Sequence, residues 1–215
     1  MTNKNKTELV LVVDRSGSMY SIQEDAEGGI NSFIDEQKLA KGEANLTLCQ
    51  FDTEYEFVEE STPISKVKPY TLVPRGGTAL NDAIGRTINE TGARLAALPE
   101  EERPALIIFL VVTDGEENSS REFTGPEIKE MIEHQKTKYS WNFNFLGTEE
   151  SSIGVARDLG FQNVAQYRGQ NSSEVYKNLS SKYAMARSAS ASGMSCVEAY
   201  ACNSITAQDS EDFMK

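Results

Sequence analysis

Five residues with oxygen-bearing side chains lie in three turns of the chain: Asp14, Ser16, Ser18, Thr78 and Asp114. The first three alternate along one turn, so their side chains can point the same way. The fourth lies in a glycine-rich turn, and the fifth ends an apolar run. Two carboxylates and three hydroxyls are ligands that suit Mg²⁺, Mn²⁺ or Ca²⁺ rather than zinc or copper. The residue types therefore predict a site for a hard divalent cation, provided that the three turns meet.

The turns can meet if the segments before them are strands of one sheet. The apolar runs 9–13 (LVLVV) and 106–112 (LIIFLVV) lack alternation, as is typical of strands buried on both faces. Each run ends at a polar turn that carries an aspartate, and helical stripes follow over 19–34 and 79–98. We predict that the two runs are adjacent inner strands and that both aspartates lie at the same end of the sheet.

The remaining patterns complete an α/β fold. Two β-rich runs, 45–51 and 55–58, predict a hairpin with one antiparallel edge strand. Further elements are predicted from the same periodicities: helices beginning at Pro126 and over 149–159 and 172–187, and strands over 141–146 and 161–167. We expect a three-layer Rossmann-like sandwich with a central, mainly parallel sheet of about six strands. In such sheets, ligands bind beyond the carboxyl ends of the strands.

Two patterns carry finer expectations. Gly28 and Gly29 interrupt the first helical stripe, so we expect a bend or close packing there. The run 141–146 (WNFNFL) alternates aromatic residues with asparagine, as a strand with one polar face would.

The domain is expected to span residues 1–187, followed by a tail over 188–215. The tail is small and polar at first and acidic at its end, which is typical of a flexible segment. Its apolar residues, such as Met194 and Tyr200, leave open a role in docking on this domain, on a partner or on a second copy.

Composition narrows the function classes. With 21 Lys and Arg against 33 Asp and Glu, the net charge is −12, which disfavours nucleic acid and anionic membranes as partners. One histidine and three cysteines make a zinc site or a disulfide framework improbable. No run approaches the roughly 20 apolar residues of a membrane helix, and no signal peptide is evident. We therefore expect a cytoplasmic protein, with a virion or a phage-infected cell as the other setting.

The motif set resembles the von Willebrand factor type A (VWA) domain family. The resemblance rests on Asp14-Arg15-Ser16-Gly17-Ser18-Met19, on Gly77-Thr78 and on Thr113-Asp114-Gly115, and it covers roughly residues 7–187. It is to compact prokaryotic or phage-type members with a metal-ion-dependent adhesion site. The resemblance implies that the three hydroxyls bind the metal and that the two aspartates act directly or through water. It also implies an open coordination position for a carboxylate from a partner.

The leading hypothesis is therefore a non-enzymatic, metal-dependent binding module. Its partner would be a protein that presents an Asp or Glu to the cation, which would be Mg²⁺, with Mn²⁺ or Ca²⁺ as alternatives. A Mg²⁺-dependent phosphohydrolase is the second hypothesis, although Ser16 stands where a second acid is typical and no phosphate-binding loop with lysine occurs. A structural or assembly component with a vestigial site is the third.

Charged residues near the turns carry weaker expectations. Arg15 and Arg75 either steer an anionic partner or simply face solvent. Glu116 and Glu117 follow the last aspartate and either add a ligand or remain solvated. His134 is expected to be a surface residue rather than a catalyst.

Overall fold

A six-stranded sheet forms the centre of the computed structural model, which describes residues 2–167 and 172–194. Its strands follow the order β3-β2-β1-β4-β5-β6, where the bounds are β1 Asn3–Asp14, β2 Glu43–Phe51, β3 Tyr55–Pro63, β4 Pro104–Thr113, β5 Asn142–Gly147 and β6 Asn163–Gln166. Only the pairing of β2 with β3 is antiparallel. The predicted mainly parallel sheet with one antiparallel edge strand is confirmed.

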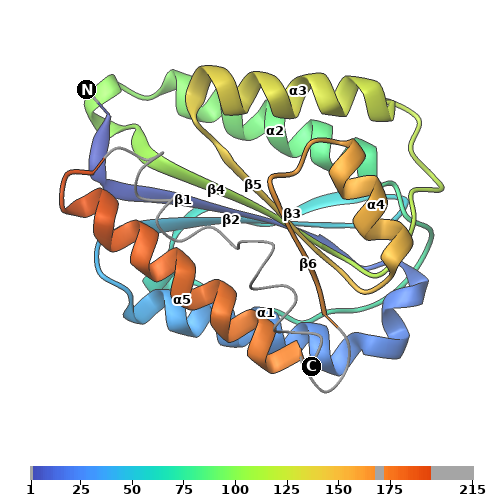
Figure 1. Cartoon of the computed structure of the whole chain (residues 1–215). Coiled ribbons are helices and arrows are strands. Elements are labelled where there is room, and N and C mark those ends of the chain that lie inside the picture. Colours follow the sequence, from blue (N-terminus) through green and yellow to red (C-terminus); the bar gives the residue numbers. More distant parts are fainter. Residues whose placement is uncertain (1, 168–171, 195–215) are drawn as a thin grey trace.

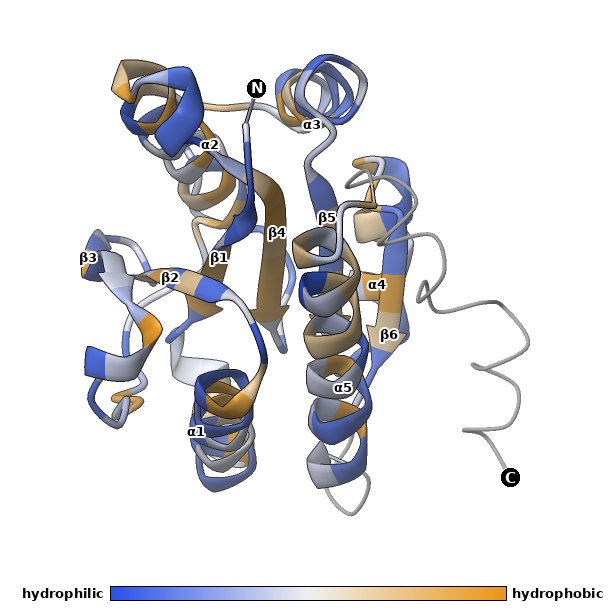
Figure 2. Ribbon diagram, turned by 90° about the vertical axis from the view of Figure 1, so that its left-hand side faces the viewer, coloured by the Kyte–Doolittle hydropathy of each residue, from blue (hydrophilic) through white to orange (hydrophobic). Residues whose placement is uncertain are grey.

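Helices cover both faces of this sheet (Figure 1). Their bounds are α1 Gln23–Leu39, α2 Leu80–Ala97, α3 Gly125–Tyr139, α4 Glu150–Asp158 and α5 Ser172–Ala191, with short 3-10 turns η1 Gly17–Ile22, η2 Ile64–Lys66 and η3 Glu100–Glu102. One apolar cluster lies between the sheet and α1 and α5, and a second lies between the sheet and α2, α3 and α4. Figure 2 shows the apolar strands β1 and β4 between these layers. Among the described helices, none combines the length and the apolar character that crossing a membrane requires.

The two apolar runs are adjacent, as predicted. Strands β1 and β4 run parallel, with Leu9 opposite Ile108 and Val13 opposite Val112. Because the strands run in the same direction, Asp14 and the turn after β4 lie at the same end of the sheet.

The polar face predicted for β5 is buried. Asn142 and Asn144 are at most 7% exposed, and their amide groups donate to the carbonyl oxygens of Ile107 and Phe109, both at 3.2 Å. The alternation therefore reflects asparagines that bond to the backbone of β4 inside the protein, where an unpaired amide would be costly.

Helix α5 extends four residues beyond the predicted end at Arg187. Its last turn packs through small side chains, and the hydroxyl of buried Ser190 donates to the carbonyl of Lys4 at 3.0 Å. Arg187 is also buried and donates to the carbonyl oxygens of Gln37 and Gly42. Most of the predicted tail, from residue 195 onward, lies outside the described residues.

The two glycines in α1 have opposite surroundings. A Cβ atom at Gly29 would lie 2.3 Å from the ring of Tyr176 on α5, whereas one at Gly28 would meet nothing within 4 Å. The expected close packing is therefore at Gly29, where the missing side chain lets α1 and α5 approach each other.

A buried carboxylate joins three loops at the end of the sheet where Asp14 lies. Asp52, in the turn between β2 and β3, accepts hydrogen bonds through Oδ2 from Nε of Arg15 at 2.8 Å and from Nε of Arg75 at 2.7 Å. Its Oδ1 accepts from the backbone N–H of Glu54 at 2.7 Å. Arg15 is only 6% exposed and also pairs with Glu56, so the expectation that it faces solvent is wrong.

The glycine pair gives a matched prediction. Gly29→Ala should lower the free energy of unfolding, because overpacking at a tight contact costs about 1–3 kcal/mol. Gly28→Ala should raise it by about 0.5–1 kcal/mol, because alanine loses less backbone entropy in a helix. Urea unfolding of both variants measures the two changes, and equal shifts would contradict the packing difference.

Removing the charge of Asp52 should lower the free energy of unfolding, because Asp52 joins three loops through Arg15 and Arg75. Burial raises the pKa of Asp52, but the bonds from Arg75 and from the backbone N–H of Glu54 outweigh it and leave the pKa below its ordinary value of 3.8. The stabilisation by ionised Asp52 is therefore present above about pH 3.8, its ordinary pKa, and is lost as the pH falls through its lower folded-state pKa. Asp52→Asn should cost about 3 kcal/mol at neutral pH, and the difference from the wild type should shrink in acid.

The exposed partner of Arg75, Glu54, supplies the control for this experiment. Its side chain is 73% exposed, so Glu54→Gln should change the free energy of unfolding by less than about 1 kcal/mol. A gap between Asp52→Asn and wild type that stays constant from neutral to acid pH would show that the charge of Asp52 is not the stabilising element.

Candidate metal centre

The first predicted turn begins where β1 ends. Its aspartate, Asp14, accepts a hydrogen bond through Oδ1 from the backbone N–H of Ser16 at 2.6 Å, which closes the turn. The hydroxyls of Ser16 and Ser18 lie 3.0 Å apart. The backbone N–H of Gly17 donates to the carbonyl of Gly76 at 3.1 Å, which holds this turn against the glycine-rich one.

Two side-chain hydrogen bonds join this turn to the end of β4. The hydroxyl of Thr113 donates to Oδ2 of Asp14 at 2.5 Å, and the hydroxyl of Ser18 donates to Oδ1 of Asp114 at 2.8 Å. Four of the five predicted residues therefore belong to one continuous polar cluster at the carboxyl ends of β1 and β4.

The fifth residue, Thr78, lies beside the same cluster. A Cβ atom at Gly115 would be 3.5 Å from Oγ1 of Thr78, 3.4 Å from Oγ of Ser18 and 3.9 Å from Oδ2 of Asp14. Side-chain oxygens from the first turn and from the glycine-rich turn therefore lie beside a backbone position of the third turn. Glycine at this position adds no side chain to the space between them.

Thr78 is positioned by a loop that sequence reasoning missed. Its backbone N–H donates to the side-chain carbonyl of Asn118 at 2.9 Å, and its own carbonyl accepts from the backbone N–H of Asn118 at 3.0 Å. Glu117, expected to be a ligand or solvated, instead accepts from the backbone N–H of Asn81 in the first turn of α2 at 2.9 Å and from Ser120. The polar run after Asp114 was the available signal, because short polar side chains often bond to nearby backbone groups.

The other charged residues do not join the cluster. Arg75 is half-exposed and is paired with Asp52 and Glu54. Glu116 is exposed, and His134 is exposed on α3, as expected for a surface residue.

Four carboxylates are buried among the described residues: Glu8, Asp14, Asp52 and Asp114. Glu8 pairs with Arg94 at 3.0 Å, and Asp52 pairs with two arginines. Neither Asp14 nor Asp114 forms an ion pair with a described Lys or Arg. Burying a carboxylate without a cationic partner is costly, so these two residues differ in kind from the other two.

The electrostatics of the pair follow from burial. Asp14 is fully buried, and this raises its pKa to about 6, although the hydrogen bonds from Thr113 and Ser16 act in the opposite direction. Burial also raises the pKa of Asp114, while the bond from Ser18 lowers it. Both carboxylates are therefore held where their negative charge is poorly solvated.

The donor set fits a hard cation by its chemistry. Two carboxylates and three hydroxyls are the ligand types that Mg²⁺, Mn²⁺ and Ca²⁺ take. The described residues contain no group of three or more His, Cys, Asp or Glu side chains arranged for a metal ion. A site here would therefore depend on hydroxyl ligands as much as on acidic ones.

Sequence comparison gives no relative. No protein-family model matches the chain, and no curated protein matches it.

Structural comparison does give a consistent result. A von Willebrand factor type A protein from Catenulispora acidiphila has a TM-score of 0.57 at 15% identity, and the match covers 84% of this chain and 43% of that one. The vWF domain of the type V pili tip protein Mfa5 from Porphyromonas gingivalis has a TM-score of 0.60 at 10% identity, over 83% and 95% of the two chains. The ArnB paralog VWA2 from Sulfolobus acidocaldarius has a TM-score of 0.54 at 12% identity, over 85% and 45%.

The lengths of these proteins differ. This chain spans less than half of the Catenulispora and Sulfolobus proteins but nearly all of the Porphyromonas domain. At such low identity the likeness concerns the arrangement of helices and strands. The sheet order, the helix layers and these matches together show that the chain has the von Willebrand factor type A fold.

Proposed function

We propose that this chain is a non-enzymatic protein-binding module in which a divalent cation accepts a carboxylate from a partner protein. The residues that would hold the cation are Asp14, Ser16, Ser18, Thr78 and Asp114. The observation that carries the proposal is the pair of buried carboxylates, Asp14 and Asp114, which lack the cationic partners that the other two buried carboxylates have.

A bound divalent cation would supply the missing positive charge and would attract a further anion. The three hydroxyls are neutral, so where an aspartate acts through a bound water rather than directly, the ion would remain electrophilic and would attract an anion. The chain's own residues hold the oxygens in place before any ligand arrives. Thr113 fixes Asp14, Ser18 bonds to Asp114, and Asn118 fixes the backbone at Thr78.

The surroundings of the cluster favour binding over turnover. The single histidine, His134, is on α3 and not among the hydrogen-bonded neighbours of the cluster. The groups that contact Asp14 and Asp114 are hydroxyls and a backbone N–H, and all of them act as hydrogen-bond donors rather than as general bases. The Porphyromonas match, which is the domain of a pili tip protein, is a further argument for a role in protein contacts.

Mg²⁺ or Mn²⁺ should raise the melting temperature of the wild type. A ligand that binds only the folded state stabilises it by about 2.7 kcal/mol at one hundred times its dissociation constant. Asp14→Asn should abolish the increase, and Ser18→Ala and Thr78→Ala should reduce it. In EDTA, Asp14→Asn should be at least as stable as wild type, because it removes a buried charge without a cationic partner. Differential scanning calorimetry in EDTA and in millimolar Mg²⁺ measures all four proteins.

Asp25, an exposed acid on α1, supplies the matched control. Asp25→Asn changes the net charge by the same amount as Asp14→Asn, so it should keep the full response to Mg²⁺. Equal melting shifts in Asp14→Asn and Asp25→Asn would mean that the ion only screens the net charge of −12.

An open coordination position can be tested separately. Mn²⁺ bound with exchangeable water should enhance the relaxation of water protons. A short peptide with a single Asp should reduce this enhancement by displacing the water, whereas its Asn counterpart should not, because the amide carries no charge. An equal effect of the two peptides would argue against carboxylate binding while leaving the metal site itself intact.

A further inference from the structure

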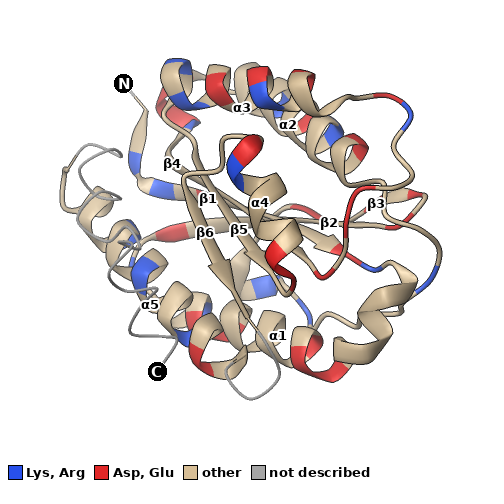
Figure 3. Ribbon diagram, turned by 45° about the vertical axis from the view of Figure 1, so that its right-hand side comes forward, with Lys and Arg blue, Asp and Glu red and all other residues tan. Residues whose placement is uncertain are grey.

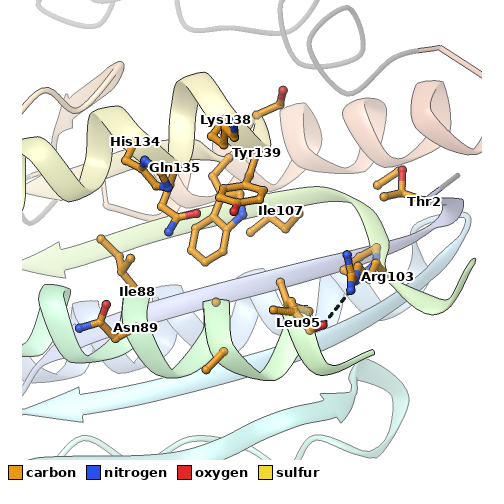
Figure 4. A pocket seen from close by; sticks show the side chains of 17 residues that line it. Thr2, Ile88, Asn89, Leu95, Arg103, Ile107, His134, Gln135, Lys138 and Tyr139 are labelled. Carbon is orange, nitrogen blue, oxygen red and sulfur yellow. Dashed lines mark hydrogen bonds between the residues drawn. The ribbon is translucent and has the colours of Figure 1, made fainter. Parts of the chain in front are cut away.

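A hollow of about 660 Å³ lies between α2 and α3, at the end of the sheet opposite to the oxygen cluster. It is bordered by the last turns of both helices and by the first residues of β4. Figure 4 shows Gln135 and Tyr139 of α3 across the hollow from Ile88 and Leu95 of α2, with Arg103 at one end. Its volume is in the range of sites that bind small molecules.

The hollow exists because the facing side of α2 carries small residues. Gly92, Ala93 and Ala96 line it, and a Cβ atom at Gly92 would meet nothing closer than the side-chain nitrogen of Gln135 at 3.9 Å. The two helices are therefore kept apart on this side without side chains that fill the gap.

The floor of the hollow is apolar and closely packed. Ile107 and Trp141 contribute to it, and the indole of Trp141 stacks on Phe109 and Phe143 with interplanar angles of 25° and 26°. Trp141 is 4% exposed, and its indole N–H donates to no described residue. The hollow therefore reaches the small exposed part of a packed aromatic cluster, which the apolar part of a ligand could contact.

The charge of the hollow is opposite to that of the protein. Arg103 and Lys138 are among the residues that line it, and no Asp or Glu is, although acidic residues exceed basic ones by 33 to 21 in the whole chain. Within the described part of the chain, neither Arg103 nor Lys138 forms an ion pair with a carboxylate. Arg103 interacts with the exposed Glu100 through charge, and both cationic side chains keep hydrogen-bond donors for a ligand.

Hydrogen bonds to the carbonyls near the ends of α2 and α3 leave donors of Arg103 and Lys138 unused. Near the end of α3, the carbonyls of Lys136 and Gln135 accept from the backbone N–H groups of Ser140 and Trp141, at 3.1 and 3.2 Å. Arg103 bonds to the carbonyls of Leu98 and Ala96 at the end of α2 through Nε and Nη2. Its third nitrogen, Nη1, donates to no described residue.

We propose that this hollow binds a small aromatic carboxylate. The ring would contact the exposed parts of Trp141 and Ile107, and the carboxylate would accept hydrogen bonds from Nη1 of Arg103 and from Lys138. Charge-assisted hydrogen bonds of this kind fix the orientation of a ligand whose apolar body supplies the buried area. The proposal is independent of the metal centre and can be tested in EDTA.

Trp141 is the only tryptophan in the chain, so its fluorescence reports on the hollow directly. The probe is para-iodobenzoate, whose iodine quenches indole fluorescence on contact. We expect saturable quenching by this carboxylate in the full-length wild type. The neutral para-iodobenzamide should bind at least about tenfold more weakly, because it lacks the charge that Arg103 and Lys138 would neutralise.

Variants locate the binding. Gly92→Leu places a side chain into the hollow while improving helix propensity, so it should fold and lose the saturable quenching. Lys138→Gln should weaken binding of the carboxylate severalfold without affecting the amide. Lys129→Gln removes an exposed lysine of the same helix that does not line the hollow, and it should bind like wild type.

Three results would overturn the proposal. The first is quenching that stays linear with probe concentration, which indicates collision only. The second is equal affinity for the carboxylate and the amide, and the third is saturable quenching that survives in folded Gly92→Leu, with folding checked by circular dichroism.

Discussion

Burial of negative charge at the carboxyl end of the sheet is the constraint on which this structure depends. Asp52 meets it with two arginines, and this ion pair joins the first turn, the hairpin turn and the glycine-rich turn. Asp14 and Asp114 lie at the same end, where only hydroxyls and a backbone N–H contact them. Because Asp52 takes up Arg15, the arginine next to Asp14 in sequence does not neutralise Asp14. Because Arg15 is paired with Asp52, we propose that an external cation neutralises Asp14 and Asp114 instead.

The layout of the strands explains why residues so far apart in sequence share one site. Parallel pairing of β1 with β4 fixes which side chains emerge together, and a shift of register would move Asp14 away from Thr113. The loop after β4 then folds back on the start of α2 and holds Thr78 through Asn118. Figure 3 shows the strands β4, β5 and β6 free of charged residues, with acidic residues concentrated in loops and on helices.

The sequence was sufficient for the elements whose pattern is local. Unbroken apolar runs predicted the inner strands, and the turn residues after them predicted which side chains gather. What it could not reveal depends on partners distant along the chain. The burial of Arg15 requires Asp52, which is 37 residues away. The last turn of α5 packs through serines and alanines, which have no apolar periodicity, and the burial of Ser190 depends on β1. Asn144 resembles a surface residue until its bond to β4 is seen.

The direction of the helices gives the two ends of the molecule opposite ligand preferences. Near the oxygen cluster, α2 begins, and its first backbone N–H groups are occupied by Glu117 and Ser120. At the far end, carbonyls near the ends of α2 and α3 are occupied by Arg103 and by backbone N–H groups. Because several of these backbone groups are already paired, side-chain charge contributes strongly to what each end attracts. In our proposals, the carboxylates without cationic partners at one end bind a cation, and the cationic side chains beside the aromatic cluster at the other end bind an apolar anion.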